Sequence, residues 1–265
     1  MDIEGRVAVV TGAGSGIGRA LARQLAEGGA SVVAGDIDSD TATQTAAEIG
    51  DRAVGVGADA ATRSGIATLL DTAREAFGPV DIYVANAGVI GAPGLGSESD
   101  WDRVLEVNLR AHIRAADALL PEWERRGSGH FVSVASAAGL LTQVGAAGYA
   151  VSKHAAVGFA EWLAITYGDS GIGVTCVCPM GVDTPLLGDI RDSADPVARV
   201  AADSITTAGE VLSAQRVAEL TVEAVRADRF MVLPHPGVGA MFAGKAADHD
   251  RWIAGMRRYQ RTLGG

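Results

Sequence analysis

Residues 7–18 read VAVVTGAGSGIG, and an apolar-periodic stretch continues from Ile17 to Glu27. The first five residues are rich in β-branched side chains and are typical of a buried strand, while the spacing after the glycines predicts a helix. A glycine-rich turn between a strand and a helix lets the backbone approach a ligand closely, and the N–H groups at the helix start face an anion. The stretch therefore predicts the pyrophosphate site of a dinucleotide, formed by Gly12, Ser15, Gly16, Ile17 and Gly18.

Strand and helix patterns alternate along most of the remaining chain. Apolar runs predict strands at 7–11, 31–35, 53–57, 80–85, 130–134, 173–177 and 230–233, and helical patterns lie between them at 17–27, 41–49, 64–77, 99–126 (with Ser99 as its N-cap), 149–167 and 213–227. Such alternation indicates parallel strands joined by crossover helices. The predicted fold class is α/β: a Rossmann-type, doubly wound, seven-stranded parallel sheet with helices on both faces, in one domain over residues 1–265.

Two segments lie outside this alternation. Residues 183–209 form a long connection, which is typical of a variable substrate loop. Residues 239–265 predict a C-terminal helical extension, because Trp252, Met256, Tyr259 and Leu263 fall at helical spacing. Three placements stay open for it: on its own subunit, on a neighbouring subunit, or as a roof over the active site.

Charge and cysteine content narrow the protein class. The 265 residues carry a formal net charge of -10, which makes nucleic acid an unfavourable partner. No apolar run reaches the roughly 18 residues of a membrane span, and the polar start with its short VAVV run indicates no secretory signal, so we expect a cytoplasmic protein. Cys176 and Cys178 lie on one predicted strand with no Cys/His pair elsewhere to complete a metal site, which favours buried thiols.

Asp36 ends the predicted second strand and indicates which dinucleotide is bound. A carboxylate there accepts hydrogen bonds from both ribose hydroxyls of the adenosine half and repels a 2′-phosphate. Ser15 stands in the glycine turn, which offers no Lys or Arg to offset that phosphate, so the predicted cofactor is NAD rather than NADP. Asp59 and Ala60 follow the third strand, where the Asp59 side chain either reaches the adenine or only shapes a turn.

Four polar residues form a candidate catalytic set. Tyr149 and Lys153 lie one turn apart on one helix face, and a cation near a phenol lowers its pKa from about 10, so this tyrosine can take a proton from an alcohol near neutral pH. Ser136 ends the fifth strand, where its hydroxyl can donate to the substrate oxygen. Asn108 is a poor helix former inside helix 99–126, and its amide is expected to hold a water that relays protons to Lys153.

Together TGAGSGIG, the Asn86-Ala87-Gly88 run, Asn108, Ser136 and Tyr149-x-x-x-Lys153 resemble the short-chain dehydrogenase/reductase family, in its compact, single-domain, NAD-preferring branch, over about residues 5–233. The resemblance implies NAD(P)-dependent hydride transfer at a carbinol or carbonyl carbon. It also implies that Tyr149 is the acid/base, that Ser136 orients the substrate, and that Lys153 binds the nicotinamide ribose.

The same resemblance extends the cofactor site. It implies that Asn86, Ala87 and Gly88 shape the wall of the cofactor pocket. It places the loop from Pro179 to Thr184 at the nicotinamide, with Gly181, Val182 and Thr184 among the binding residues. The sequence departs from the family at Met180, where glycine is common, and in PHPGVG at residues 234–239. That second departure weakens the expectation of the family's tetramer, so the expected assembly is a homotetramer or a homodimer.

The substrate is predicted from the loops at the carboxyl ends of the strands, residues 90–97, 138–148 and 184–205, which are mostly apolar. They favour a neutral, hydrophobic secondary alcohol or ketone, of steroid, terpenoid, cyclic or aryl-alkyl type. The candidate substrate-binding residues are Ser136, Ala138, Val144, Tyr149, Met180, Leu186 and Leu187. Two alternatives remain: a 3-oxoacyl-type ketoreductase that uses NADPH, and a catalytically silent NAD-binding sensor.

Overall fold

The computed structural model describes residues 1–264. Its central sheet has seven parallel strands in the order β3-β2-β1-β4-β5-β6-β9, so the predicted fold class is confirmed. The strands are β1 (Val7–Thr11), β2 (Ser31–Asp36), β3 (Ala53–Gly57), β4 (Ile82–Ala85), β5 (Gly129–Val134), β6 (Ile172–Val177) and β9 (Met231–Val232). From β1 the sheet grows outward through β2 and β3, and the chain then crosses to β4 on the other side of β1. The connections that leave the carboxyl ends of β1 and β4 therefore diverge, and a crevice lies between them.

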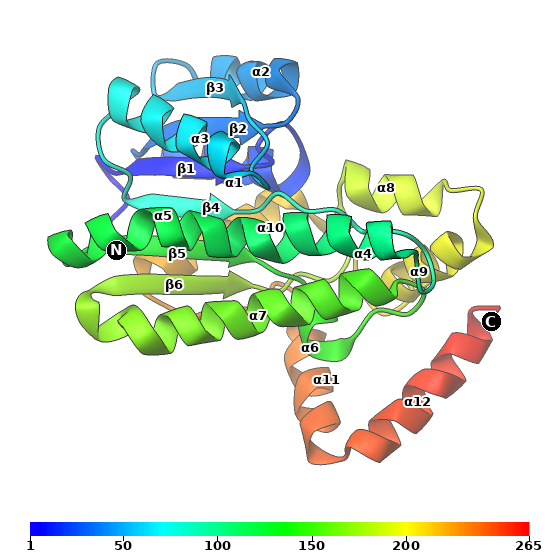
Figure 1. Ribbon diagram of the computed structural model, residues 1–265. Helices are drawn as coiled ribbons and strands as arrows, with labels where there is room; N and C mark the ends of the chain where they lie inside the picture. Colours follow the sequence, from blue (N-terminus) through cyan, green and yellow to red (C-terminus); the bar gives the residue numbers. More distant parts are fainter. Residues whose placement is uncertain (265) are drawn as a thin grey trace.

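Helices cover both faces of the sheet (Figure 1). One face carries α1 (Gly16–Glu27), α2 (Ser39–Ile49) and α10 (Ala214–Arg226), and the other carries α3 (Arg63–Ala76), α5 (Ala111–Arg126) and α7 (Ala147–Tyr167). Successive strand residues face opposite layers: Ala8 and Val10 pack under α1 and α10, whereas Val9 packs under the other three helices. Both layers are apolar and buried, so every central strand is held from two sides.

The predicted helix 99–126 is not continuous. Ser97, rather than Ser99, is the N-cap of α4 (Glu98–Leu105), and it forms a capping box with Asp100. A π-helical turn at Glu106–Arg110 separates α4 from α5. Asn108 lies in this turn, where its side chain bonds to other elements, and such contacts commonly accompany a π-turn at a functional site.

The predicted loop 183–209 contains two helices, α8 (Pro185–Arg191) and α9 (Pro196–Thr206). Each begins with proline after a side-chain N-cap, Thr184 and Asp195, which is a favoured helix start. A short parallel pair, β7 (Val182–Asp183) and β8 (Leu212–Ser213), joins the two ends of this segment. A further short helix, α6 (Ala138–Leu141), follows β5 and precedes α7.

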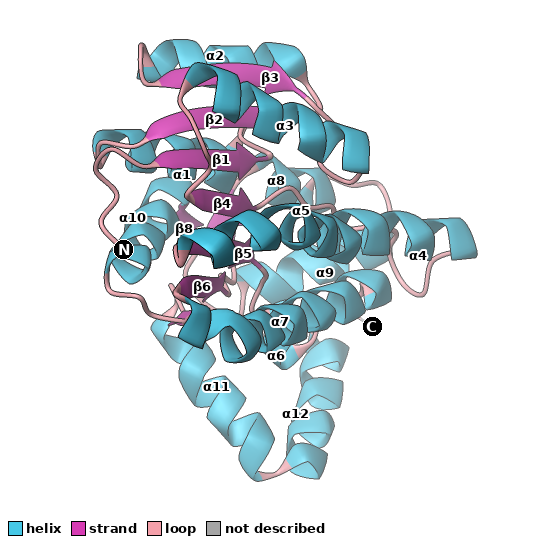
Figure 2. Cartoon of the chain, turned by 60° about the vertical axis from the view of Figure 1, so that its left-hand side comes forward, coloured by secondary structure: helices cyan, strands magenta, loops and turns pink. Residues whose placement is uncertain are grey.

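The C-terminal extension consists of two helices, α11 (Pro236–Ala247) and α12 (His249–Thr262), instead of the single helix expected around residues 252–263. We call Pro236–Thr262 the C-terminal hairpin. It projects from the body near α6 and turns back toward α9 (Figure 2). Within residues 1–264, no helix is long and apolar enough to cross a bilayer. Cys176 and Cys178 are buried free thiols with their sulfurs 3.8 Å apart.

Candidate active site

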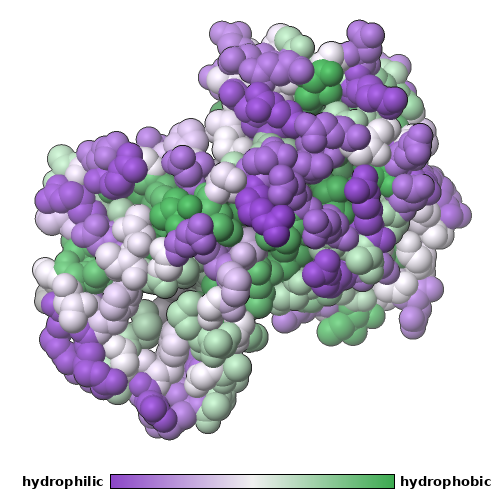
Figure 3. Space-filling view, turned by 180° about the vertical axis from the view of Figure 1, so that it is seen from behind, coloured by the Kyte–Doolittle hydropathy of each residue, from purple (hydrophilic) through white to green (hydrophobic). Residues whose placement is uncertain are grey.

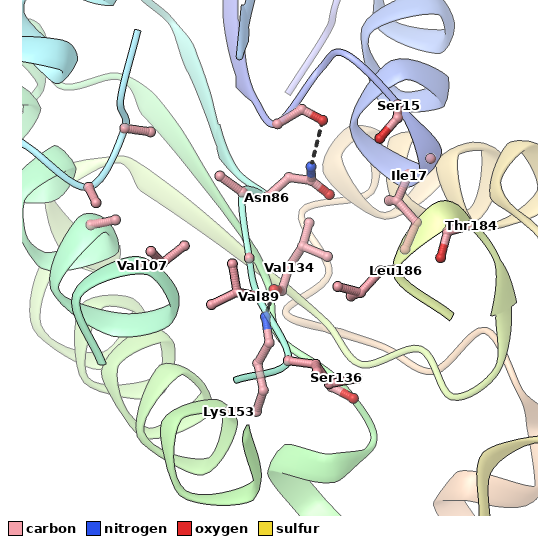
Figure 4. Close-up of a pocket in the computed structure, with 18 of the residues that line it drawn as sticks. Ser15, Ile17, Asn86, Val89, Val107, Val134, Ser136, Lys153, Thr184 and Leu186 are labelled. Carbon is pink, nitrogen blue, oxygen red and sulfur yellow. Dashed lines mark hydrogen bonds between the residues drawn. The ribbon is translucent and has the colours of Figure 1, made fainter. Parts of the chain in front are cut away.

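A cavity of about 920 Å³ opens at the carboxyl ends of β1, β4 and β5. Most residues predicted to bind the cofactor line it: Gly12, Ser15, Gly16, Ile17, Asp36, Asp59, Ala60, Asn86, Ala87, Gly88, Tyr149, Lys153, Pro179, Val182 and Thr184. Gly18 and Gly181 are not among its lining residues. Figure 4 shows Ser15 and Ile17 at one end of this cavity and Lys153 and Ser136 at the other, with Thr184 and Leu186 on the facing wall.

The glycine turn has the backbone that a pyrophosphate needs. Gly12 and Gly16 have φ angles of +65° and +50°, which side chains rarely adopt. A Cβ on Gly18 would lie 2.0 Å from the Gly12 carbonyl oxygen, so Gly18 permits α1 to pack against the turn instead of lining the cavity. The residues therefore fit a dinucleotide, because the turn leaves the first N–H groups of α1 open to an anion.

Asn86 holds the turn in place. Its Nδ2 donates to the carbonyl oxygens of Thr11 (2.8 Å) and Gly12 (3.3 Å). The Thr11 hydroxyl in turn accepts from the backbone N–H groups of Asn86 and Ala87, each at 3.0 Å. Thus the segment after β4 is fixed to the segment after β1, across the point where the two strands diverge.

Asp36 stands at the end of β2 beside the glycine turn. Its Oδ2 accepts from the Gly14 N–H at 2.9 Å and its Oδ1 from the Asp38 N–H at 3.1 Å. Arg19, the nearest basic residue in the sequence, is turned away from the cavity, because its guanidinium donates to the Gly14 carbonyl and to Thr45 Oγ1. Ile37 follows Asp36, lines the cavity and is 77% exposed, which suits the flat face of an adenine.

Asp59 shapes a turn at the edge of the cavity, and its contact with the adenine stays a prediction. Its Oδ1 accepts from the Ala61 N–H at 2.9 Å, as a turn-forming aspartate does. It also lines the cavity, beside the buried Ala60.

Tyr149 and Lys153 lie on one face of α7 and are both buried. Lys153 Nζ is 5.7 Å from the centre of the Tyr149 ring and donates to the Val134 carbonyl at 3.0 Å. Figure 4 shows the Lys153 side chain directed toward Val134. Burial lowers the pKa of Lys153 to about 8, so the ammonium still dominates at neutral pH. A Cβ on Gly88 would lie 3.5 Å from Lys153 Nζ, so this glycine leaves the ammonium accessible from the cavity.

The pKa of Tyr149 differs from the sequence expectation. Burial raises it above its ordinary value, and the Ser136 hydroxyl beside it acts in the opposite direction. Proximity to Lys153 alone therefore does not produce the expected lowering. The sequence shows the spacing of tyrosine and lysine but not the depth at which both are buried.

Ser136 and Asn108 are both brought to this place. The Ser136 hydroxyl accepts from the Ala138 N–H at 3.1 Å and lies 3.4 Å from the Pro179 carbonyl, and the residue lines the cavity with Tyr149. Three hydrogen bonds hold the Asn108 amide: Oδ1 accepts from the Val89 N–H at 2.9 Å, and Nδ2 donates to Val89 O at 2.8 Å and to Ser152 Oγ at 3.0 Å. Both Nδ2 hydrogens are used, so a relay water would have to donate to Oδ1, and the expected water relay stays a prediction.

A second cavity, of about 320 Å³, adjoins the first at Ser136, Tyr149, Met180 and Ile205, which line both. Ala138 and Val144 line this smaller cavity, as predicted for substrate-binding residues. Leu186 and Leu187 line only the larger one. Every residue that lines the smaller cavity is uncharged.

His235 was missed by the motif analysis. It is buried, and it accepts at Nδ1 from the Met180 N–H (3.1 Å) while Nε2 faces the Gly181 carbonyl oxygen at 3.0 Å. The tautomer with its proton on Nε2 fits both contacts, because Nδ1 then accepts from the Met180 N–H and Nε2 donates to the Gly181 carbonyl. The histidine thus holds the loop that separates the two cavities. Its position in the PHPGVG segment, which departs from the family pattern, is the sequence signal that could have found it.

Other residues of the larger cavity were also missed, because they belong to no motif. They come from residues 61–63, 89, 103–114 and 134–135.

The family model described as short chain dehydrogenase matches residues 6–195. The chain belongs to the short-chain dehydrogenase family. The dehydrogenase is 36% identical over 241 residues to 1-deoxy-11-beta-hydroxypentalenate dehydrogenase of Streptomyces exfoliatus, which covers 87% of this chain and 83% of that relative. It is 38% identical over 190 residues to cis-4-hydroxycyclohexanecarboxylate dehydrogenase of Sinomonas cyclohexanicum, over 70% of this chain and 76% of that one.

A solved structure supports the same assignment. A short-chain dehydrogenase/reductase from Burkholderia phymatum in complex with NAD superimposes with a TM-score of 0.85 at 32% identity, covering 94% of this chain and 96% of the other. The family resemblance is confirmed, and this dehydrogenase is an oxidoreductase that acts on CH–OH donors.

Proposed function

We propose that this dehydrogenase interconverts a neutral, hydrophobic secondary alcohol and its ketone with NAD, and that Tyr149 is the acid/base. The observation that carries the proposal is the position of Ser136 and Tyr149 at the junction of the two cavities. The larger cavity has the glycine turn and Asp36 of a dinucleotide site, and the smaller one is uncharged. A carbinol carbon in the smaller cavity would thus lie beside both hydroxyl groups.

The residues of the larger cavity would hold NAD, which supplies the hydride acceptor and a positive charge when bound. The glycine turn presents backbone N–H groups to the pyrophosphate. Asp36 keeps acceptor sites on both carboxylate oxygens for the adenosine ribose, and it opposes the extra phosphate of NADP. Thr184 lies close to Gly16, since a Cβ there would be 3.1 Å from its methyl group, and it completes the wall near the nicotinamide end.

In oxidation, Ser136 would donate a hydrogen bond to the substrate oxygen while Tyr149 takes the hydroxyl proton. Because burial raises the pKa of Tyr149, the phenolate needs nearby positive charge, which the Lys153 ammonium provides from within the same buried site. Asn108 acts as a positioning residue: it fixes the π-helical turn to Val89 and to Ser152 of α7, next to Lys153.

The substrate class follows from the smaller cavity. Its lining has no charged side chain to pair with a carboxylate or phosphate, and burying an unpaired charge there is costly. The relatives named above carry acids in their substrates' names, so this chain is expected to differ from them in charge preference.

Exposed apolar residues on α5 and α7 support a homodimer or homotetramer. Val151, Trp162 and Ile165 of α7 are 50%, 51% and 83% exposed, and Ile113 of α5 is 41% exposed. Such a patch is typical of a protein–protein interface. Light scattering of the purified protein tests this: a mass of one chain would contradict it.

The activity is tested by a panel of secondary alcohols assayed with NAD and with NADP. We expect NADH formation with cyclic, terpenoid and aryl-alkyl alcohols, and a ketone as the product. Turnover restricted to sugars, phosphorylated alcohols or hydroxy acids would overturn the proposed substrate class. Faster turnover with NADP would overturn the proposed cofactor.

A further inference from the structure

The C-terminal hairpin reaches across the substrate side of the active site. In Figures 1 and 2, α11 leaves the body beside α6 and α12 returns toward α9, so the hairpin spans the space between these two elements. Figure 3 shows an opening between the hairpin and the rest of the molecule. The hairpin therefore bounds a space instead of packing flat on the domain.

Two polar side chains attach the hairpin: Lys245, near the end of α11, and Tyr259, near the end of α12. Lys245 Nζ of α11 donates to the Leu140 carbonyl of α6 at 2.6 Å. The Tyr259 hydroxyl of α12 donates to the Ser204 carbonyl of α9 at 3.0 Å and pairs with the Thr207 hydroxyl at 2.7 Å. No residue of α12 is fully buried, although Trp252 packs against the core together with Val238 and Met241 of α11.

One face of α12 is turned toward the smaller cavity. Trp252, Met256 and Tyr259 lie at positions i, i+4 and i+7 and line it together with Met241 of α11. The neighbouring side chain Ile253 is 49% exposed and does not line the cavity. The hairpin thus supplies one wall of the cavity, whose lining also includes Ser136 and Tyr149.

The body side of the cavity is fixed independently. Gln143 Nε2 donates to the Ser204 hydroxyl at 2.9 Å and lies 3.3 Å from the Ala201 carbonyl oxygen, which ties α9 to the segment after α6. The hairpin wall is attached separately, by the Lys245 and Tyr259 contacts and by the packing of Val238, Met241 and Trp252 on the core. The size of the cavity therefore depends on the side chains of α12 and on its attachment.

We propose that the C-terminal hairpin is the substrate-selecting wall of this active site, with Trp252 and Met256 limiting substrate size and Tyr259 as the positioning residue that holds α12 on α9. The inference rests on the proposed function, because it assigns the smaller cavity to the alcohol. At about 320 Å³, the cavity is at the small end of the range for ligand sites, so it suits a compact neutral alcohol of one or two rings. A four-ring steroid alcohol, one of the classes allowed by the sequence, would collide with α12.

The first test is Trp252→Ala, with Ile253→Ala as the matched control on the same helix. Cyclohexanol and a four-ring hydroxysteroid serve as the small and large alcohols. Opening the cavity by an indole is expected to raise kcat/KM for the steroid about tenfold or more and to lower it for cyclohexanol severalfold, since single-group changes in a pocket alter discrimination by such factors. The KM for NAD stays unchanged, and Ile253→Ala behaves like the wild type.

The second test is Tyr259→Phe, with Tyr167→Phe at the end of α7 as its control. The Tyr259 hydroxyl makes two hydrogen bonds to α9 and the residue that follows it, and contacts no reacting atom. Its loss is therefore expected to raise KM for cyclohexanol about threefold to tenfold, with kcat and the KM for NAD unchanged. A purely structural defect would instead lower both kcat and thermal stability.

Binding measured without turnover separates the two proposals. Cyclohexanone added to the protein with NAD, which has no hydride to give, forms a complex that cannot react. Its binding is expected to quench the Trp252 fluorescence, and the quench is lost in Trp252→Phe. If cyclohexanone quenches the fluorescence but no secondary alcohol is turned over, the proposed function is wrong, while the role of the hairpin as a wall of the binding cavity still holds. If the wild type turns over secondary alcohols and folded Trp252→Ala has the same ratio of kcat/KM for cyclohexanol to kcat/KM for the steroid, the proposed role of the hairpin is wrong, while the proposed function still holds.

Discussion

Replacing Asp36 with alanine tests how this dehydrogenase selects its dinucleotide. The carboxylate stands at the end of β2 and accepts the N–H groups of Gly14 and Asp38, at 2.9 and 3.1 Å. Each oxygen has a second acceptor site, so each can take one ribose hydroxyl. The same negative charge lies where the 2′-phosphate of NADP would be placed.

The expected shift follows from two energies. A hydrogen bond to a charged acceptor contributes about 1.5–3 kcal/mol, so losing one lowers kcat/KM for NAD roughly 10- to 150-fold. The repulsion between two unit charges about 4 Å apart is about 1 kcal/mol in bulk water and about 4 kcal/mol at an effective dielectric constant of 20, so its removal raises kcat/KM for NADP about fivefold or more. The ratio of kcat/KM for NAD to kcat/KM for NADP therefore falls by about 50-fold or more.

Initial rates with one alcohol and varied cofactor measure this ratio. Asp36→Asn keeps an oxygen to accept from the Gly14 N–H, so it separates the loss of charge from a distorted turn. Asp40→Ala on the exposed face of α2 is the matched control and should keep the wild-type ratio. If folded Asp36→Ala still prefers NAD as strongly as the wild type, Asp36 does not face the ribose and the cofactor argument is wrong.

Two other predictions concern buried histidines. His235→Leu loses the contacts to Met180 and Gly181, so it should raise the KM values for cofactor and alcohol about tenfold, with a smaller change in kcat. His235→Gln should recover most of this loss. If His235→Leu has the kinetic constants of the wild type, the histidine does not hold the loop in its binding position. Burial lowers the pKa of His112 to about 3 and that of His130 to about 4. Both histidines stay neutral in the folded state while the unfolded chain binds protons below about pH 6.5, so the free energy of unfolding should fall between pH 6.5 and 4, by at most about 1.4 kcal/mol per pH unit for each histidine. Urea unfolding across this range measures the slope, and a flat profile would contradict it.

The parts of the site that could be predicted are those encoded in local sequence. Glycines between a strand and a helix, an acidic residue at the end of the next strand, and tyrosine and lysine four apart each depend on short-range geometry. Parallel strands then bring their carboxyl ends to one edge of the sheet, so Gly12, Asp36, Ser136 and Tyr149 line one cavity without any further information. The helices after Thr184 and Asp195 were also encoded locally, in the cap-proline pairs, although they were predicted as a loop.

The rest depends on contacts between distant segments. The π-helical turn at Asn108 is stabilised by Val89 and Ser152, which no helix pattern reveals. The raised pKa of Tyr149 comes from its burial in the assembled site. The course of the C-terminal hairpin is set by bonds from Lys245 to Leu140 and from Tyr259 to Ser204, and periodicity showed only that α12 has an apolar face.

The central claim is that Tyr149 transfers the proton while the dinucleotide is held by other residues. Tyr149→Phe keeps the ring and removes only the hydroxyl, so the decisive measurement compares its NADH affinity, by fluorescence titration, with its steady-state turnover of the best alcohol. We expect unchanged NADH binding and a loss in kcat of about 10²- to 10⁴-fold, the usual contribution of general acid–base catalysis. Turnover within a few-fold of the wild type, with NADH still bound, would contradict the mechanism.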